Sequence, residues 1–240
     1  MRLTKREHGG RISGSLIHIN VTVDSANYPA VLLATEAIMP EQKSSLHAYL
    51  NWTKQRIDEM DATLASLRAR ANRAASTAKR DQLVADLKKR RDEFQAKAKA
   101  AAKAGEGAAQ SGKAQLERQW GAFEAQLKAY FKTAGTRAEQ QHATFRAVAT
   151  AQSKAWRETA SKLRAEAAKA AAVRRADIHG AIEQLKANSA AAEARLQKLR
   201  GVGSKSWPAF GAALSKSRKA FDQANHAAWD ALKRATHSKS

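Results

Sequence analysis

The feature that most constrains the fold of this chain is a row of apolar residues spaced alternately three and four positions apart. The spacing is unbroken from Ile57 to Ala78, and it resumes at Leu83 after a slip near Asp81. Residues at this spacing share one face of an α-helix, and a sustained seven-residue repeat is typical of helices that pack side by side. The pattern predicts three long helices, over about 43–103, 113–199 and 204–236.

Alanine supplies much of the apolar content, which is 43% of the residues, whereas aromatic residues make up 6%. A chain rich in Ala, Lys, Arg, Glu and Leu at helical spacing is typical of long helices or coiled coils and not of a thick core. We therefore predict an all-α fold of elongated antiparallel helical hairpins. Two outer helices cover the middle one along one side only. Part of each apolar stripe then stays exposed, and we expect the chain to form a homo-oligomer through it.

Two aromatic segments, at 120–131 and 207–221, resemble each other. Each begins with Trp-x-Ala-Phe, has a Leu four residues later, and follows an alanine-rich helix and a glycine turn. The likeness predicts a duplication, with one helical hairpin in residues 39–135 and a second in residues 136–240. The residues expected to pack the helices together and to mediate self-association are Trp120, Phe123, Leu127, Phe131, Trp207, Phe210, Leu214 and Phe221.

Residues 1–38 differ from the rest of the chain. The stretch 16–23 alternates apolar and polar residues as a β-strand does, but no second strand is present to pair with it. An isolated strand is not stable in water, so we expect a disordered N-terminal extension. Pro40 at the first helical position and Glu41 in the first turn then mark the start of the first helix.

Glycine residues mark the expected ends of the helices. Gly105, Gly107 and Gly112 predict a turn, and Ser111 is expected to cap the helix that follows. Gly135 has no proline or capping residue beside it. Because one glycine costs only about 1 kcal/mol in a helix interior, we expect the middle helix to continue through it.

Positive charge is the one feature that indicates a partner, because the net charge is +21. Lys and Arg outnumber Asp and Glu by 4 to 3 in residues 1–38, by 18 to 11 in 39–131 and by 21 to 8 in 132–240. Such a field attracts nucleic acid and other polyanions, although a charge run can also be merely the solvated face of a helix. The residues most suited to contact phosphates are Lys88, Lys89, Arg90, Arg91, Arg174 and Arg175.

No motif in the chain indicates an enzyme. The absence of cysteine excludes disulfides and thiolate metal sites. Glu139 and His142 have the spacing of a helical metal site, but such sites need a second pair and further glutamates. Residues 201–206 differ from a phosphate-binding loop, which has a glycine directly before its lysine and a strand before the loop. We expect no catalytic residue, no cofactor, no bound metal and no small-molecule substrate.

The runs IDEMDATL from Ile57 to Leu64 and LKKRRDEFQAK from Leu87 to Lys97, followed by a glycine turn and a Trp/Phe helix, resemble a family of small bacterial coiled-coil proteins. Many of these are described as stress-response proteins. The resemblance implies two long-short helical hairpins in tandem and assigns no functional residue. We expect a cytoplasmic, non-catalytic scaffold or stress-associated protein that self-associates. The alternatives are sequence-independent binding of nucleic acid through the basic C-terminal half and, less favoured, binding to a membrane or storage-granule surface.

Overall fold

The computed structural model describes residues 40–69, 77–133, 138–169, 175–200 and 206–237, and within them the predicted all-α fold is confirmed. These residues form helices and no strand: α2 (Pro40–Ala69), α3 (Thr77–Ala104), α4 (Glu106–Thr133), α5 (Ala138–Ala168), α6 (Arg175–Arg200) and α7 (Trp207–His237). The chain divides into two units, residues 1–38 and 39–240, and all of these helices belong to the second. The extension predicted for residues 1–38 lies outside the described residues.

The helices are shorter than the apolar spacing predicts. The single helix expected over 43–103 is wrong, because α2 ends at Ala69 and α3 begins at Thr77 and packs beside it. The single helix expected over 113–199 is also wrong, because α5 and α6 lie side by side. Apolar residues keep the same spacing whether a helix runs on or folds back, and folding back lets the stripes bury one another. The predicted continuity through Gly135 falls on residues 134–137, outside the described residues.

A single residue connects α3 to α4. Gly105 has a φ of 100°, a left-handed conformation that is costly for residues with a side chain. Its amide donates a hydrogen bond to the carbonyl oxygen of Ala102 at 3.3 Å. The turn is therefore narrower than predicted, because Gly107, Ser111 and Gly112 are already part of α4. Ser111 does not cap that helix.

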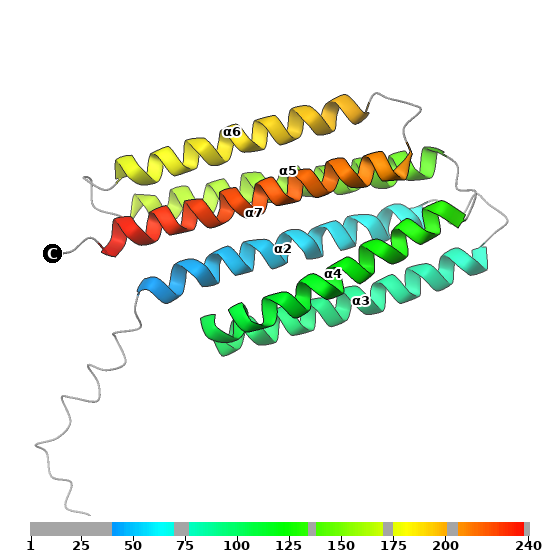
Figure 1. The fold of residues 1–240 in the computed structure, drawn as a ribbon, viewed down its shortest axis with the longest axis horizontal. Helices are drawn as coiled ribbons and strands as arrows, with labels where there is room; N and C mark the ends of the chain where they lie inside the picture. Colours follow the sequence, from blue (N-terminus) through cyan, green and yellow to red (C-terminus); the bar gives the residue numbers. More distant parts are fainter. Residues whose placement is uncertain (1–39, 70–76, 134–137, 170–174, 201–205, 238–240) are drawn as a thin grey trace, which may run out of the picture. The chain divides into compact units, whose positions relative to one another are not determined.

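Within the unit of residues 39–240, α2 packs against α3, α4, α5 and α7. The helix α3 packs on α2 and α4, whereas α6 packs on α5 and α7. Figure 1 shows α3 and α6 on opposite sides of these helices, with α2 between them. The predicted halves contain three helices each, and they pack together through α2 against α5 and α7 as one compact unit.

The large apolar side chains of the stripes are buried between the helices. Phe94, Phe123, Trp156 and Phe221 are each exposed by 1% or less. Burial of such a side chain contributes about 1.5–3 kcal/mol to stability. Among the residues that the structure describes, Leu50 is the only exposed large apolar side chain, at 40%. Within the described residues, the prediction that the stripes stay partly exposed is therefore wrong.

Candidate functional site

The described helices differ in charge, and α3 is the most basic. It contains nine Lys and Arg residues against four Asp and Glu residues. The ratio is five to two in α7, five to three in both α5 and α6, four to three in α4 and four to four in α2. Part of the excess in residues 132–240 therefore comes from basic residues outside α5, α6 and α7. The most basic helix lies in the first half of the chain.

The quartet 88–91, predicted to bind polyanions, lies on α3. Consecutive residues of a helix point in different directions, so the four cations do not form one patch. Arg91 forms an ion pair with Asp61 of α2 at 2.9 Å. Arg90 donates a hydrogen bond to Gln126 of α4 at 2.9 Å. Lys89 is exposed and forms no ion pair with a described carboxylate of α2 or α4. Of the four cations, it is therefore the one best placed to bind an external anion.

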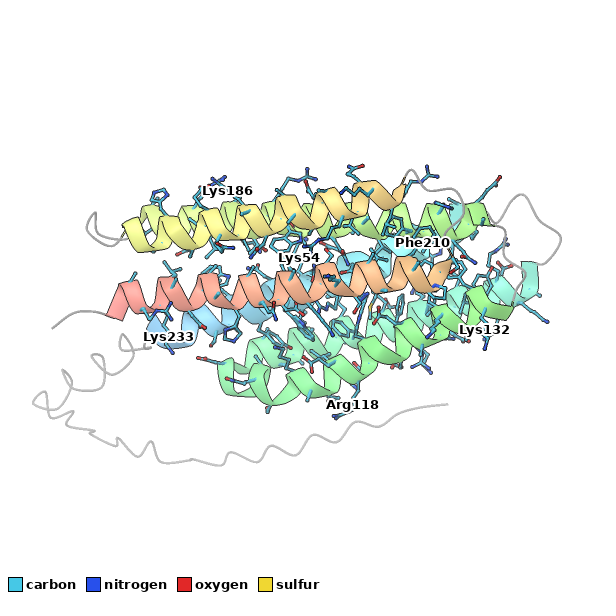
Figure 2. All side chains as sticks on the ribbon, turned by 45° about the horizontal axis from the view of Figure 1, so that its top comes forward. Lys54, Arg118, Lys132, Lys186, Phe210 and Lys233 are labelled. Carbon is cyan, nitrogen blue, oxygen red and sulfur yellow. The ribbon has the colours of Figure 1, made fainter. Side chains whose placement is uncertain are left out.

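The second predicted pair lies at the start of α6. Arg174 falls outside the described residues, and so does the side chain of Arg175, the first residue of α6. Further along, Arg157 and Arg164 of α5 are exposed and line a shallow groove together with Lys186 of α6. Figure 2 shows Lys186 pointing away from the bundle. Lys186 is paired with Glu183, and Glu193 lines the same groove, so the two arginines are the cations there that form no ion pair with a described carboxylate.

Five lysines of α3 are exposed and have no carboxylate within ion-pair distance among the described residues. We call them the α3 lysine row, and they are Lys79, Lys89, Lys97, Lys99 and Lys103. By the periodicity of the helix, Lys89, Lys99 and Lys103 lie on the side opposite Leu87 and Phe94, which are fully buried. At 1.5 Å per residue the five lysines span about 36 Å of the helix axis, and Lys79 and Lys97 lie on the flank, about 160° around the axis from Lys99.

A seam of buried polar side chains joins α2 and α7, and the sequence analysis did not predict it. Asn51 of α2 donates a hydrogen bond to Asn225 of α7 at 3.2 Å, and both side chains are buried. Arg56 of α2 forms two hydrogen bonds with the carboxylate of Asp222 of α7, at 2.9 and 2.6 Å. Such paired geometry is the strongest form of Arg–carboxylate contact. The seam therefore fixes how these two helices align.

At the next position of the seam, Glu59 of α2 meets Arg218 of α7. The two residues are 1% and 4% exposed, and Glu59 Oε2 lies 3.4 Å from Arg218 Nε. Both terminal nitrogens of Arg218 donate to Oε1 of Glu124 on α4, one of them at 2.6 Å. The guanidinium group also lies over the ring of Trp120, 4.9 Å from its centroid. Arg218 thus connects α7 to α2 and α4.

The amide of Gln152 on α5 lies beside the carboxyl group of Glu59. The contact lacks good hydrogen-bond geometry, and the same amide nitrogen donates to the carbonyl oxygen of Leu214 at 3.2 Å. Burial raises the pKa of Glu59 from 4.5 to about 7, and the positive charges of Arg218 and Arg56 and the amide of Gln152, which lower the pKa, only partly oppose this rise. Near neutral pH the group is therefore close to half ionised.

Beside this carboxyl group, a groove of about 380 Å³ opens between α4 and α7, and we call it the α4–α7 groove. Glu59 of α2 and Val148 of α5 are buried and line its inner part, whereas Ala125 and Lys128 of α4 are exposed at its rim. Its apolar walls include Trp120, Phe123, Leu127, Trp207 and Leu214. A cavity of this size with apolar walls and a few polar groups is typical of small-molecule sites.

The eight residues predicted to pack the helices together divide equally between α4 and α7. Seven of them are buried, and Trp120 is partly buried and lines the α4–α7 groove. The two aromatic segments meet within one chain, because the ring centroids of Phe131 and Trp207 are 4.3 Å apart. Figure 2 likewise shows Phe210 between neighbouring helices, in contrast to Arg118, which points outward from α4.

The seam was missed because a helix's sequence does not show what covers its polar face. The apolar stripe of α2 indicates a solvated opposite face, but four neighbouring helices surround α2. A signal was nevertheless present, since opposite charges at matching spacing on two antiparallel helices can pair. The complementary residues occur in reverse order, Asn51, Arg56 and Glu59 on α2 and Asn225, Asp222 and Arg218 on α7.

Glu139 and His142, the pair with the spacing of a helical metal site, lie on α5. His142 packs the edge of its ring against Phe210, with centroids 4.8 Å apart. Within the described helices, no three His, Asp or Glu side chains gather as metal ligands would. The glycine-rich segment 201–205 lies outside the described residues. None of the described helices combines the length and the apolar character that crossing a bilayer requires.

A comparison of this chain with protein families, curated proteins and solved structures finds no match. Function must therefore be argued from the arrangement of its own residues. The described residues offer two distinct features, the α3 lysine row on the surface and the α4–α7 groove between helices. The first can attract an anion over a long distance, and the second can enclose a small molecule.

Proposed function

We propose that this protein binds nucleic acid without sequence preference through the α3 lysine row, and that it has no catalytic role. The observation that carries the proposal is the presence on one helix of five exposed lysines with no carboxylate partner among the described residues. Ammonium groups of this kind are attracted to phosphates, and their binding releases counterions condensed on the nucleic acid. We place the protein in the cytoplasm, where nucleic acid is available to it.

The residue type of the row supports binding to the phosphate backbone and not to base edges. Base readout commonly uses arginine, asparagine or glutamine, which contact a base through two hydrogen bonds. A lysine ammonium group is a compact point charge on a flexible stem and suits contacts with phosphates. The row consists of lysines alone, so affinity is expected to depend on the number of neutralised phosphates and not on base order.

The burial of the aromatic residues supports this proposal over the two alternatives that rely on apolar contacts. Self-association through the apolar stripes and binding to a lipid or granule surface both require exposed Trp and Phe side chains. The Trp and Phe residues of α4 and α7 are instead buried or partly buried within one chain. Electrostatic attraction is the interaction that the described surface supports best.

The test compares the full chain with a triple variant, Lys89→Gln, Lys99→Gln and Lys103→Gln, using short DNA duplexes of two unrelated sequences. The measurement is fluorescence anisotropy over a series of salt concentrations. We expect the unmodified protein to bind both duplexes equally, with a slope of log affinity against log salt of about −3 if Lys89, Lys99 and Lys103 contact phosphates. The triple variant should bind more weakly, and its slope should be smaller in magnitude by about 3.

A matched control removes the same amount of charge elsewhere, through Lys198→Gln, Lys216→Gln and Lys219→Gln on α6 and α7, where all three lysines are exposed. This variant should retain both the affinity and the slope, apart from a small uniform loss due to net charge. Circular dichroism verifies that both variants keep their helices. Equal losses in the two triple variants, or no DNA binding by the unmodified protein at low salt, would contradict the proposal.

A further inference from the structure

The α4–α7 groove contains a buried carboxyl group whose hydrogen-bonding capacity is largely unused by the described chain. Glu59 is 1% exposed, its oxygens accept no hydrogen bond of good geometry from the described residues, and Gln152 is the amide beside it. Its nearest cation, Arg218, reaches it only through Nε at 3.4 Å, because both terminal nitrogens of Arg218 bind Glu124. A buried ionised carboxylate without donors is unfavourable. A ligand that brings a donor to Glu59 therefore supplies an interaction that the protein lacks.

Two carboxylates of the groove share one guanidinium group. Glu59 is buried, Glu124 has a side chain that is 42% exposed, and Arg218 contacts both. Arg56 lies nearby, but its charge is matched by the aspartate of α7 to which it is bonded. Lys128 belongs to the exposed rim, where water screens its charge. When Glu59 is ionised, it therefore shares the positive charge of Arg218 with Glu124, which Arg218 contacts more closely.

The walls of the groove suit an apolar body. Trp120, Leu127 and Trp207 line it from α4 and α7, and Val148 lines it from α5. An aromatic or branched aliphatic group placed against these side chains loses contact with water, which favours binding. Indole rings also attract cations over their faces, as the position of Arg218 over the Trp120 ring demonstrates. Both the charged end and the apolar end of a small amphiphilic cation thus have complementary surroundings.

We propose that the α4–α7 groove binds a small organic cation, with a primary ammonium group at Glu59 and an aromatic or branched apolar body against Trp120, Leu127 and Trp207. The site is formed by four helices of the same chain. It does not include the α3 lysine row, so the proposal stands independently of nucleic-acid binding.

The test uses 2-phenylethylamine as the probe, followed by tryptophan emission and isothermal titration calorimetry on the full chain. Two molecules of the same ring and chain length separate the contributions of the head group. They are 3-phenylpropionate, which is an anion, and 2-phenylethanol, which is neutral. We expect the amine to bind at pH 8 at least tenfold more tightly than the alcohol, and the carboxylate not to bind. Equal binding of all three would overturn the proposal, because it would show that the apolar walls alone hold them.

Glu59→Gln tests the role assigned to the carboxylate, and Glu117→Gln is its matched control, because Glu117 is exposed on α4 and does not line the groove. The first variant should weaken amine binding at least tenfold, whereas the second should leave it unchanged. Ala125→Trp fills the exposed rim of the groove without altering its charged groups, and it should also abolish binding. Unchanged binding in Glu59→Gln, or in Ala125→Trp, would refute this location of the site.

The pH dependence of binding supplies a readout that a merely structural role of Glu59 would not change. The charged and polar groups facing Glu59 are Arg218, Arg56, Glu124 and Gln152, from all helices packed around it. Together with burial they place the pKa of Glu59 at about 7. The carboxylate form that the amine needs is therefore scarce at pH 6 and dominant at pH 8. Amine affinity should fall about tenfold between pH 8 and pH 6, and a flat profile would overturn the proposal.

Discussion

Replacing Glu59 with Gln should make the protein more stable at pH 8 and leave its stability at pH 4 nearly unchanged. In the unfolded chain the pKa of Glu59 is 4.5, and burial raises it to about 7 in the folded protein. Between these two values the folded state holds a proton that the unfolded state releases. The contribution of Glu59 to stability is therefore highest below pH 4.5 and is lost as the pH rises through 7. Glutamine resembles the protonated carboxyl group at every pH and avoids this loss.

The magnitude follows from the pKa difference. A rise in pKa from 4.5 to about 7 corresponds to about 3 kcal/mol of lost stability at pH 8. For a chain of this length that is a change in melting temperature of roughly 6–12 °C. The net rise in pKa already includes the attraction of Arg218 and Arg56 for the carboxylate, which lowers the pKa. The free-energy value therefore needs no separate correction for the loss of this attraction in Glu59→Gln.

The assay is urea unfolding followed by circular dichroism at pH 4, 5, 6, 7 and 8, for the unmodified protein, Glu59→Gln and the surface control Glu117→Gln. The difference between Glu59→Gln and the unmodified protein should grow steadily from pH 5 to pH 8. Glu117→Gln should parallel the unmodified protein at every pH. A Glu59→Gln variant that is less stable at pH 8, or a difference that is the same at pH 4 and pH 8, would contradict the expected effect of the raised pKa. Either result would mean that the ionised carboxylate is stabilised in the fold.

Three further predictions concern the fold. Gly105→Ala should lower stability by about 1–2 kcal/mol, because Gly105 has a positive φ. Gly121→Ala should raise stability by up to about 1 kcal/mol, because a Cβ atom added at Gly121 has no neighbouring atom within 4 Å. Urea unfolding measures both changes. Arg56→Ala should cost about 2–3 kcal/mol in the same assay because it leaves a partly buried carboxylate of α7 unpaired, whereas Lys88→Ala, which breaks an exposed pair, should cost less than about 0.5 kcal/mol. Deleting residues 1–38 should leave the melting temperature unchanged, because all described core residues belong to the unit 39–240. Equal effects within either pair of variants, or a loss of several degrees on deletion, would contradict the corresponding argument.

The helical class and much of the core could be predicted from the sequence, because side chains at steps of three and four share a helix face in any packing arrangement. Leu87, Phe94 and Phe123 were assigned to the stripe and are fully buried or nearly so. The reversals between α2 and α3 and between α5 and α6 could not be predicted in the same way. Residues 70–76 and 170–174 contain neither glycine nor proline, which are the usual signals of a turn. Only the slip of the stripe near Asp81 indicated the first of them.

The candidate sites differ in how far the sequence could reveal them. The lysines of α3 were visible as charge, but which of them lack a carboxylate partner depends on the neighbouring helices. Arg91, for example, was grouped with Lys89 and instead pairs with Asp61 of α2. No sequence pattern indicated the α4–α7 groove, because its lining residues come from four helices. The spacing of apolar residues within each helix does not specify how those helices are placed relative to one another. From the sequence alone, Glu59 is indistinguishable from a solvent-exposed glutamate, because its burial depends on the packing of α7 against α2.

The α3 lysine row and the α4–α7 groove respond to different solution conditions because their charges lie in different surroundings. The lysines are exposed, so salt weakens their attraction to phosphates. Glu59 is buried, so salt screens it little, whereas its charge changes around pH 7. Raising the salt concentration at pH 8 should therefore remove DNA and leave a bound amine. Lowering the pH to 6 at low salt should release the amine and leave DNA bound. No described residue of α3 lines the groove, so we expect the two sites to act independently. Loss of both ligands together, on raising the salt concentration or on lowering the pH, would show that the two sites are coupled.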